Sequence, residues 1–339
     1  MRADGALRGK MKDEELYRGD LVEVRSPSDI LATLDESGAL AGLPFMPEMV
    51  AYCGRRFTVS YRADKICDTV EYTGSRRVPS AVYLEDLRCN GSGHDGCQAE
   101  CRILWKAAWL RKVTSDTPPA PAFTPSAAQA LLERVSRDTR SIVEKEGKVE
   151  SLYRCQNTDI LRYSEYLYVW DPRPYLREYT SGNVSLFHFL QVSSRAAVTE
   201  PMRKFGYMPE IHLPGTAAPT DKFAPLNLQP GELVRVKSKE EIAKTLTPEG
   251  RTKGMWFDRE MMPYCGGVYR VRQRIERFIY ERNGRLLVLK NQPVTLEGAI
   301  CSGDRSICRW FCPRAIYPFW HECWLERVET APKTEGKSF

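Results

Sequence analysis

The sequence has few of the features that mark membrane or secreted proteins. None of its apolar runs approaches the roughly 18 residues that a transmembrane helix requires. The first 20 residues, MRADGALRGKMKDEELYRGD, have no apolar stretch like the one at the centre of a signal peptide. We therefore expect a cytoplasmic protein without a membrane span.

The common sequence signatures of enzymes are also missing. The chain has only four histidines, and it has no Gly-rich phosphate loop, no Gly-x-Ser-x-Gly motif and no His-x-Glu metal motif. Its 23 glycines and 22 prolines are an ordinary share of 339 residues, which excludes a mainly low-complexity chain. These absences favour a folded binding or scaffold protein over an enzyme.

The strongest positive feature is an internal duplication with an offset of 212 residues. Residues 19–54 align without a gap on residues 231–266, with 16 identities in 36 positions. The match continues at Cys89 and Cys301 and ends at Trp109-Leu110 and Trp324-Leu325. We therefore divide the chain into a tail (1–17), repeat 1 (18–113), a Pro-rich linker (114–125), a middle segment (126–208), a second linker (209–229), repeat 2 (230–328) and a second tail (329–339).

Each repeat carries the pattern of a small β-barrel with one short helix. LVEV and LVRV alternate apolar and charged residues, as half-buried strands do. Ser26-x-x-Asp29 and Ser238-x-x-Glu241 are typical of capping boxes at the start of a helix. Further strands are expected near residues 57–61 and 268–275, with a hairpin turn at Asn283-Gly284. The predicted fold class is mainly β, with two duplicated barrels that flank a helical insert.

The opening Gly-Asp/Glu-x-Val-x-Val strand resembles that of Src-homology-3-like or KOW-type barrels. The complete pattern of capped helix, Tyr-Cys-Gly, cysteine triplet and terminal Trp-Leu resembles a group of uncharacterised bacterial tandem-repeat, cysteine-rich proteins. This resemblance covers most of the chain and implies the barrel fold, but it implies no activity.

The middle segment is predicted to be a small, mostly helical domain with its own core. Residues 127–147 fit one amphipathic helix with Leu131, Leu132, Val135, Ile142 and Val143 on one side. Residues 150–208 are expected to form two or three more helices.

Eight of the 11 cysteines fall on duplicated positions, four in each repeat. Four thiolates can close the shell of a tetrahedral zinc ion, so we predict two structural zinc ions. Disulfides and an iron–sulfur cluster are the alternatives for these thiols. The predicted metal ligands are Cys53, Cys89, Cys97 and Cys101 in repeat 1, and Cys265, Cys301, Cys308 and Cys312 in repeat 2.

The other candidate ligands and thiols are harder to place. His94 lies in the repeat 1 cysteine loop and could replace a thiol, but a solvated loop residue is the preferred interpretation because repeat 2 has no histidine there. Cys67 is expected to be buried filler, and Cys155 has no predictable partner.

The Trp-rich end of repeat 2 differs from that of repeat 1. It reads Trp-His321-Glu322-Cys323-Trp where repeat 1 has Trp-Lys-Ala-Ala-Trp. On a strand, His321 and Cys323 would share a face and could form a base and a nucleophile. These three residues and Cys155 are the catalytic candidates if the chain is a metal-dependent or thiol enzyme of a bacterial biosynthetic pathway, which is the alternative function.

Repeat 2 also carries the excess positive charge. Residues 230–328 include 18 basic and 12 acidic residues, which equals the net charge of +6 of the whole chain. Arg270, Arg272 and Arg274 alternate along one expected strand and therefore share a face. We predict a non-catalytic, zinc-stabilised binding or scaffold protein whose arginine face contacts an acidic protein, a phosphorylated ligand or RNA. A dedicated nucleic-acid-binding protein is a further alternative.

Overall fold

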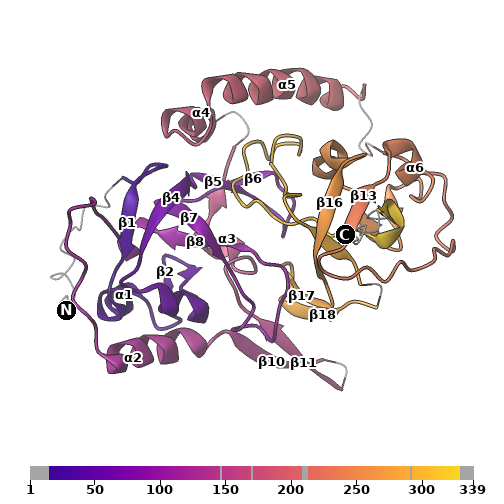
Figure 1. Cartoon of the computed structure of the whole chain (residues 1–339). Helices are drawn as coiled ribbons and strands as arrows, with labels where there is room; N and C mark the ends of the chain where they lie inside the picture. Colours follow the sequence, from indigo (N-terminus) through magenta and orange to yellow (C-terminus); the bar gives the residue numbers. More distant parts are fainter. Residues whose placement is uncertain (1–14, 146, 169–170, 208–212, 291, 329–339) are drawn as a thin grey trace, which may run out of the picture.

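The computed structural model describes residues 15–328 except 146, 169–170, 208–212 and 291. It is mainly β, with several antiparallel sheets and few helices (Figure 1). No helix in the described part of the chain is long and apolar enough to cross a membrane. Most of the first predicted tail and all of the last lie outside the described residues.

Repeat 1 is built on a five-stranded sheet of order β8-β7-β4-β1-β9. A short hairpin, one α-helix and two 3-10 turns (η1, η2) surround this sheet, and two further strands extend from it. The elements are β1 (Leu21–Val24), α1 (Pro27–Thr33), β2 (Ala39–Leu40), β3 (Leu43–Pro44), η1 (Pro47–Tyr52), β4 (Arg56–Arg62), β5 (Lys65–Cys67), β6 (Ser75–Arg77), β7 (Ala81–Arg88), β8 (Arg102–Lys106), η2 (Ala107–Trp109) and β9 (Leu110–Lys112).

Repeat 2 is built on a four-stranded sheet of order β19-β16-β13-β20. Its elements follow one another in nearly the same order as those of repeat 1. They are β13 (Leu233–Val236), α6 (Lys239–Ala243), β14 (Arg251–Thr252), β15 (Met255–Trp256), η3 (Arg259–Tyr264), β16 (Val268–Arg274), β17 (Arg277–Tyr280), β18 (Arg285–Val288), β19 (Val294–Leu296), η4 (Glu322–Trp324) and β20 (Leu325–Arg327).

The duplication extends to the register of the strands. Val22 pairs with Phe57 in repeat 1, and Val234 pairs with Tyr269 in repeat 2, so both positions differ by the offset of the sequence alignment. The register shifts between residues 59 and 61 in β4 and between the corresponding residues 271 and 273 in β16. The two repeats therefore share one strand arrangement. One sheet curls into a half-barrel, and the closed Src-homology-3-like barrels stay a prediction.

Both predicted helix caps are present. In repeat 2 the Ser238 hydroxyl accepts from the Glu241 N–H (3.2 Å) and the Glu241 carboxylate accepts from the Ser238 N–H (2.8 Å), a complete capping box. In repeat 1 the Ser26 hydroxyl accepts from the Asp29 N–H, but the shorter Asp29 carboxylate accepts from the Ser26 hydroxyl instead of its backbone. The aspartate version thus supplies half of the motif.

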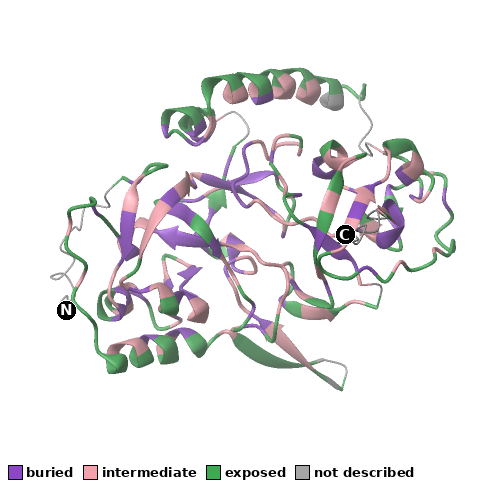
Figure 2. Ribbon diagram, in the orientation of Figure 1, coloured by how far each residue is buried: buried purple, intermediate pink, exposed green. Residues whose placement is uncertain are grey.

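Paired tryptophans fill the core of each repeat. Trp105 and Trp109 are fully buried, with Phe45 edge-on to both rings at 5.9 and 5.1 Å. In repeat 2, Phe257 lies in the same way against two fully buried tryptophans, Trp320 and Trp324. Figure 2 shows the buried residues concentrated in the strands of the two repeats, whereas α2 and α5 expose most of their length.

The middle segment differs from the predicted helical domain. Its elements are α2 (Pro125–Ser136), β10 (Arg140–Lys145), β11 (Lys148–Tyr153), α3 (Ile160–Tyr163), β12 (Glu165–Tyr166), α4 (Arg173–Thr180) and α5 (Leu186–Lys204). The predicted helix over 127–147 is wrong beyond Ser136, because 140–153 form a β-hairpin whose Ile142 and Val143 are exposed. Leu131 and Val135 do face inward, but they pack into the core of repeat 1.

The middle segment joins the two repeats through its strands and helices. β11 pairs with β18 of repeat 2, and β12 pairs with β6 of repeat 1. Figure 1 shows α4 and α5 across the top of both repeats. Glu178 of α4 binds Lys65 of repeat 1 (2.7 Å), and the Phe189 ring of α5 stacks on Phe311 of repeat 2 (5.8 Å). An independent core for this segment is therefore not confirmed.

Candidate functional sites

One side-chain cluster of the structure contains a predicted metal ligand. No disulfide bond joins any of the 11 cysteines, all of which lie in the described part of the chain. Among the described residues, only Glu48, Cys89 and His94 form a group of at least three Cys, His, Asp or Glu side chains whose ligand atoms all lie within 4.8 Å of one another. Cys89 is thus the one predicted ligand in such a group, which we name the Glu48–Cys89–His94 cluster. Two zinc ions, each held by four cysteines, stay a prediction.

Cys53 and Cys265 occupy equivalent positions directly after η1 and η3. Cys53 is buried, and this burial raises the pKa of its thiol to about 12. Burial also raises the pKa of Cys265. Each thiol is therefore protonated at neutral pH in the metal-free protein.

Cys97 and Cys312 lie where the loop of one repeat packs on the other repeat. The Cys67 N–H of repeat 1 donates to Cys312 Sγ (3.2 Å), and the Ile279 N–H of repeat 2 donates to Cys97 Sγ (3.4 Å). Cys67 and Ile279 occupy corresponding positions in β5 and β17, so the cysteine loop of each repeat packs against the same strand of the other repeat. Cys301, Cys308 and Cys101 belong to the same two loops.

Cys67 is buried as expected, and it lies beside the charged side chain of Arg314. Arg314 Nη1 lies 3.8 Å from its Sγ. The hydrogen bond with Cys312 and the Arg314 guanidinium lower the pKa of Cys67, against the opposing effect of burial. Cys155 follows β11, donates its N–H to the Thr158 hydroxyl (2.8 Å), and has a pKa raised to about 12 by burial.

The Glu48–Cys89–His94 cluster lies inside repeat 1. Glu48 comes from η1, Cys89 directly follows β7, and His94 comes from the loop after it. Cys89 Sγ and His94 Nδ1 are 4.0 Å apart. His94 is only 1% exposed, so the interpretation of this residue as a solvated loop histidine is wrong. Burial raises the pKa of Cys89, and the neighbouring Glu48 carboxylate raises it further.

The predicted arginine face of repeat 2 is partly occupied by contacts within the chain. Arg272 Nε and Nη2 donate to the Glu100 carboxylate of repeat 1 at 2.7 and 3.1 Å. Arg270 donates to the Gly231 carbonyl (2.6 Å) and is half exposed. Arg274 turns to the other end of the strand, where it lines a pocket. The three guanidinium groups therefore have three different environments.

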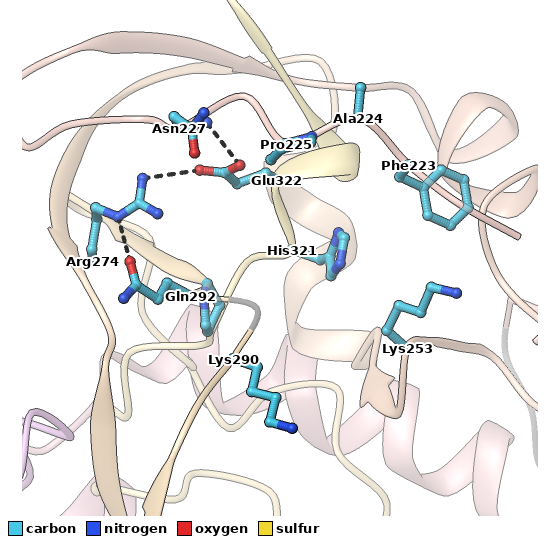
Figure 3. Close-up of a pocket in the computed structure, with 11 residues that line it drawn as sticks. Phe223, Ala224, Pro225, Asn227, Lys253, Arg274, Lys290, Gln292, His321 and Glu322 are labelled. Atoms are coloured by element: carbon cyan, nitrogen blue, oxygen red, sulfur yellow. Dashed lines mark hydrogen bonds and ion pairs between the residues drawn. The ribbon is translucent and has the colours of Figure 1, made fainter. Parts of the chain in front are cut away.

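That pocket, the repeat 2 pocket, is a cavity of about 470 Å³ (Figure 3). The linker before repeat 2 supplies residues 223–225 and Asn227, and the β14–β15 turn supplies Lys253. Arg274 ends β16, and Lys290, Gln292 and Pro293 precede β19. His321 and Glu322, at the start of η4, complete the lining. Three of the predicted site residues thus meet in one cavity.

Glu322 has a structural function in this pocket. Its carboxylate accepts from the N–H groups of Leu226, Asn227 and Leu228 at 2.7, 3.0 and 2.9 Å. Arg274 Nη1 adds a fourth contact at 3.3 Å, and Figure 3 shows the two side chains facing each other. Glu322 therefore fastens the linker to repeat 2, and both of its oxygens are engaged.

His321 and Cys323 do not lie on a strand as the alternation predicted. His321 caps the 3-10 turn η4, and its Nδ1 accepts from the Cys323 backbone N–H (3.1 Å), which leaves the ring proton on Nε2. Burial lowers the pKa of His321 and raises that of Cys323 to about 11. At neutral pH the His321 imidazole is therefore neutral and the Cys323 thiol is protonated. The hydrogen bond between the two residues joins Nδ1 of His321 to the backbone N–H of Cys323.

Three charged residues of these sites were absent from the sequence-based prediction: Glu48, Lys253 and Lys290. Glu48 could have been found because it is identical to Glu260 in the ungapped alignment. Lys253 stands where repeat 1 has Ala41, and Lys290 where it has Val78, so both belong to the divergence between the copies. No known protein family model matches the chain, and no curated protein matches it significantly.

Proposed function

We propose that this chain is a non-catalytic binding protein, and that its repeat 2 pocket binds a small ligand through a phosphate group. One observation carries this proposal: three cationic side chains, Lys253, Arg274 and Lys290, line a single cavity, and the one carboxylate among its described lining residues is already engaged. A volume of about 470 Å³ suits a small molecule.

The cations keep donors for a ligand. Lys253 Nζ donates one hydrogen bond to the Pro219 carbonyl (3.1 Å), which leaves two of its three N–H groups. Arg274 donates through Nε and Nη1 to Gln292, Leu228 and Glu322, and its Nη2 has no partner among the described residues. Charged donors of this kind form short, strong bonds to phosphate oxygens.

His321 adds a neutral donor beside these charges. Its ring packs edge-on against Phe223 (centroids 6.2 Å apart), and Lys253 is close enough to lower its pKa. With Nδ1 engaged by the backbone, its Nε2–H is available as a donor. The raised pKa of Cys323 removes the thiolate that nucleophilic catalysis needs, which supports binding over a thiol enzyme.

The test is calorimetric titration of the full chain with inorganic phosphate and pyrophosphate. We expect wild-type protein to bind, and Lys253→Met and Lys290→Met each to weaken binding about 10-fold, the effect of losing one charged hydrogen bond. Lys239→Met is the matched control, because Lys239 is an exposed lysine of repeat 2 outside the pocket, and it should bind as wild type does.

Any of four results would overturn the proposal. The first is absence of phosphate binding by the wild type, and the second is unchanged binding by the Lys253→Met, Lys290→Met double variant. The third is tighter binding of a single-stranded RNA that falls steeply with salt and ignores both lysine variants, which would establish the nucleic-acid alternative. Turnover of a phosphate ester that is lost in His321→Ala would establish the enzyme alternative.

A further inference from the structure

We infer that the Glu48–Cys89–His94 cluster is a zinc site, and that the chain holds one zinc ion of mixed ligation rather than two ions that each have four cysteine ligands. The three ligand atoms lie within 4.8 Å of one another. Thiolate, imidazole and carboxylate are the three side-chain groups that bind zinc in proteins. They come from two separate segments, since Glu48 precedes the other two by several strands of repeat 1.

The Glu48 carboxylate lacks partners outside the cluster. Both of its oxygens are inaccessible to solvent and have no hydrogen-bond partner among the described residues other than Cys89. Glu48 also has no ion pair with a lysine or arginine among the described residues. A buried carboxylate without a counter-charge is strongly unfavourable, and a divalent cation would satisfy it together with the thiolate and the imidazole.

Repeat 2 provides an internal comparison. Glu260 occupies the position of Glu48 in the matching turn η3, below the matching cysteine loop. Its carboxylate accepts from the N–H groups of Arg305 (2.6 Å) and Ser306 (2.7 Å) and from the Ser302 hydroxyl (2.9 Å). In repeat 2 the loop itself therefore satisfies the glutamate.

The two loops thus place different groups beside the buried glutamate. The repeat 1 loop places the Cys89 thiol and the His94 imidazole beside Glu48, where repeat 2 places two backbone N–H groups. The repeat 2 loop, CSGDRSIC, has no histidine, and its glutamate has no free oxygen for a metal. We therefore assign zinc to repeat 1 only.

The first test uses the wild-type chain. After removal of metal with a chelator, zinc is titrated back and its stoichiometry and affinity are measured against a chromophoric competitor, with X-ray absorption at the zinc edge on the reloaded protein. We expect one equivalent of zinc, with one sulfur ligand at about 2.3 Å and nitrogen or oxygen ligands at about 2.0–2.2 Å. Two equivalents, four sulfur ligands per zinc, or no zinc binding would overturn the inference.

Variants separate this site from the predicted quartet. Loss of a residue that hydrogen-bonds a metal ligand weakens metal binding roughly 10–100-fold. Glu48→Gln and His94→Gln remove the ligands themselves, so each should weaken zinc binding by more than this. Cys53→Ser and Glu260→Gln are the matched controls, and each should keep one equivalent at wild-type affinity. Zinc lost in Cys53→Ser but kept in His94→Gln would assign the ion to the quartet instead.

Discussion

Lys65 and Glu178 offer the most quantitative test of how the chain is assembled. Lys65 Nζ is fully buried and donates to Glu178 (2.7 Å) and to the carbonyls of Trp310 (2.7 Å) and Phe311 (3.0 Å). These contacts connect repeat 1 to α4 and to the cysteine loop of repeat 2. The other Glu178 oxygen accepts from Asn183 (2.8 Å).

Replacing Lys65 by Met should destabilise the protein by about 3–5 kcal/mol, because the Glu178 carboxylate would stay buried without its counter-charge. The matched control is Lys112→Met. Lys112 pairs with Asp20 at a similar distance (2.8 Å), but its side chain is 39% exposed, and an exposed pair contributes about 0–1 kcal/mol.

The assay is urea unfolding of the full chain, with the slope of the transition compared between variants. The double variant Lys65→Met, Glu178→Met should lose less stability than the sum of the two single variants, because it removes both charges together. A Lys65→Met loss below about 1 kcal/mol, the upper end for an exposed pair, or strict additivity in the double variant, would refute this reasoning.

Three further predictions concern the cores and the surface pairs. Trp109→Ala should cost about 3–5 kcal/mol in the same unfolding assay, since the ring is fully buried and its Nε1–H donates to Thr33 (3.1 Å); a cost under about 1 kcal/mol would contradict the described core. Burial of Glu23 opposes ionisation, but hydrogen bonds from Arg111 and Arg56 outweigh it and lower the pKa of Glu23. The contribution of Glu23 to the free energy of unfolding is therefore present above pH about 4.5 and is lost as pH falls through the folded pKa. The stability difference between wild type and Glu23→Gln should shrink in acid. Arg272→Ala should cost only about 0–1 kcal/mol and leave phosphate binding unchanged, because the Arg272–Glu100 pair is partly exposed and lies outside the pocket; loss of phosphate binding would restore the arginine stripe as the ligand site.

The sequence predicted the repeated part of the fold well. The ungapped alignment of residues 19–54 on 231–266 anticipates the shared strand register, because buried valines at alternate positions permit only one pairing face. The serine caps were also readable, since each depends on residues close in sequence.

The middle segment shows where local patterns were insufficient. Residues 140–145 fit a helical stripe, but β-branched Ile142 and Val143 favour a strand, and β11 finds its partner in β18, far along the chain. The pairing with repeat 2 stabilises the hairpin, and no local pattern could reveal it.

The candidate sites depended on contacts between distant residues. The sequence alone indicates an exposed loop histidine at position 94. In the structure η1 places Glu48 beside the loop, and His94 is a buried neighbour of a carboxylate and a thiol. Arg274, His321 and Glu322 were singled out, but Lys253 and Lys290 were not, because single lysines in polar turns have no distinguishing pattern.

The most direct measurement of the central claim is histidine side-chain NMR of the full chain during titration with inorganic phosphate. With only four histidines, the His321 resonances can be assigned from one His321→Gln variant. We expect the Nε2–H signal of His321 to shift and saturate, and the His94 and His188 signals to stay in place. Saturable phosphate binding that leaves the His321 signal unmoved would contradict a ligand in the repeat 2 pocket.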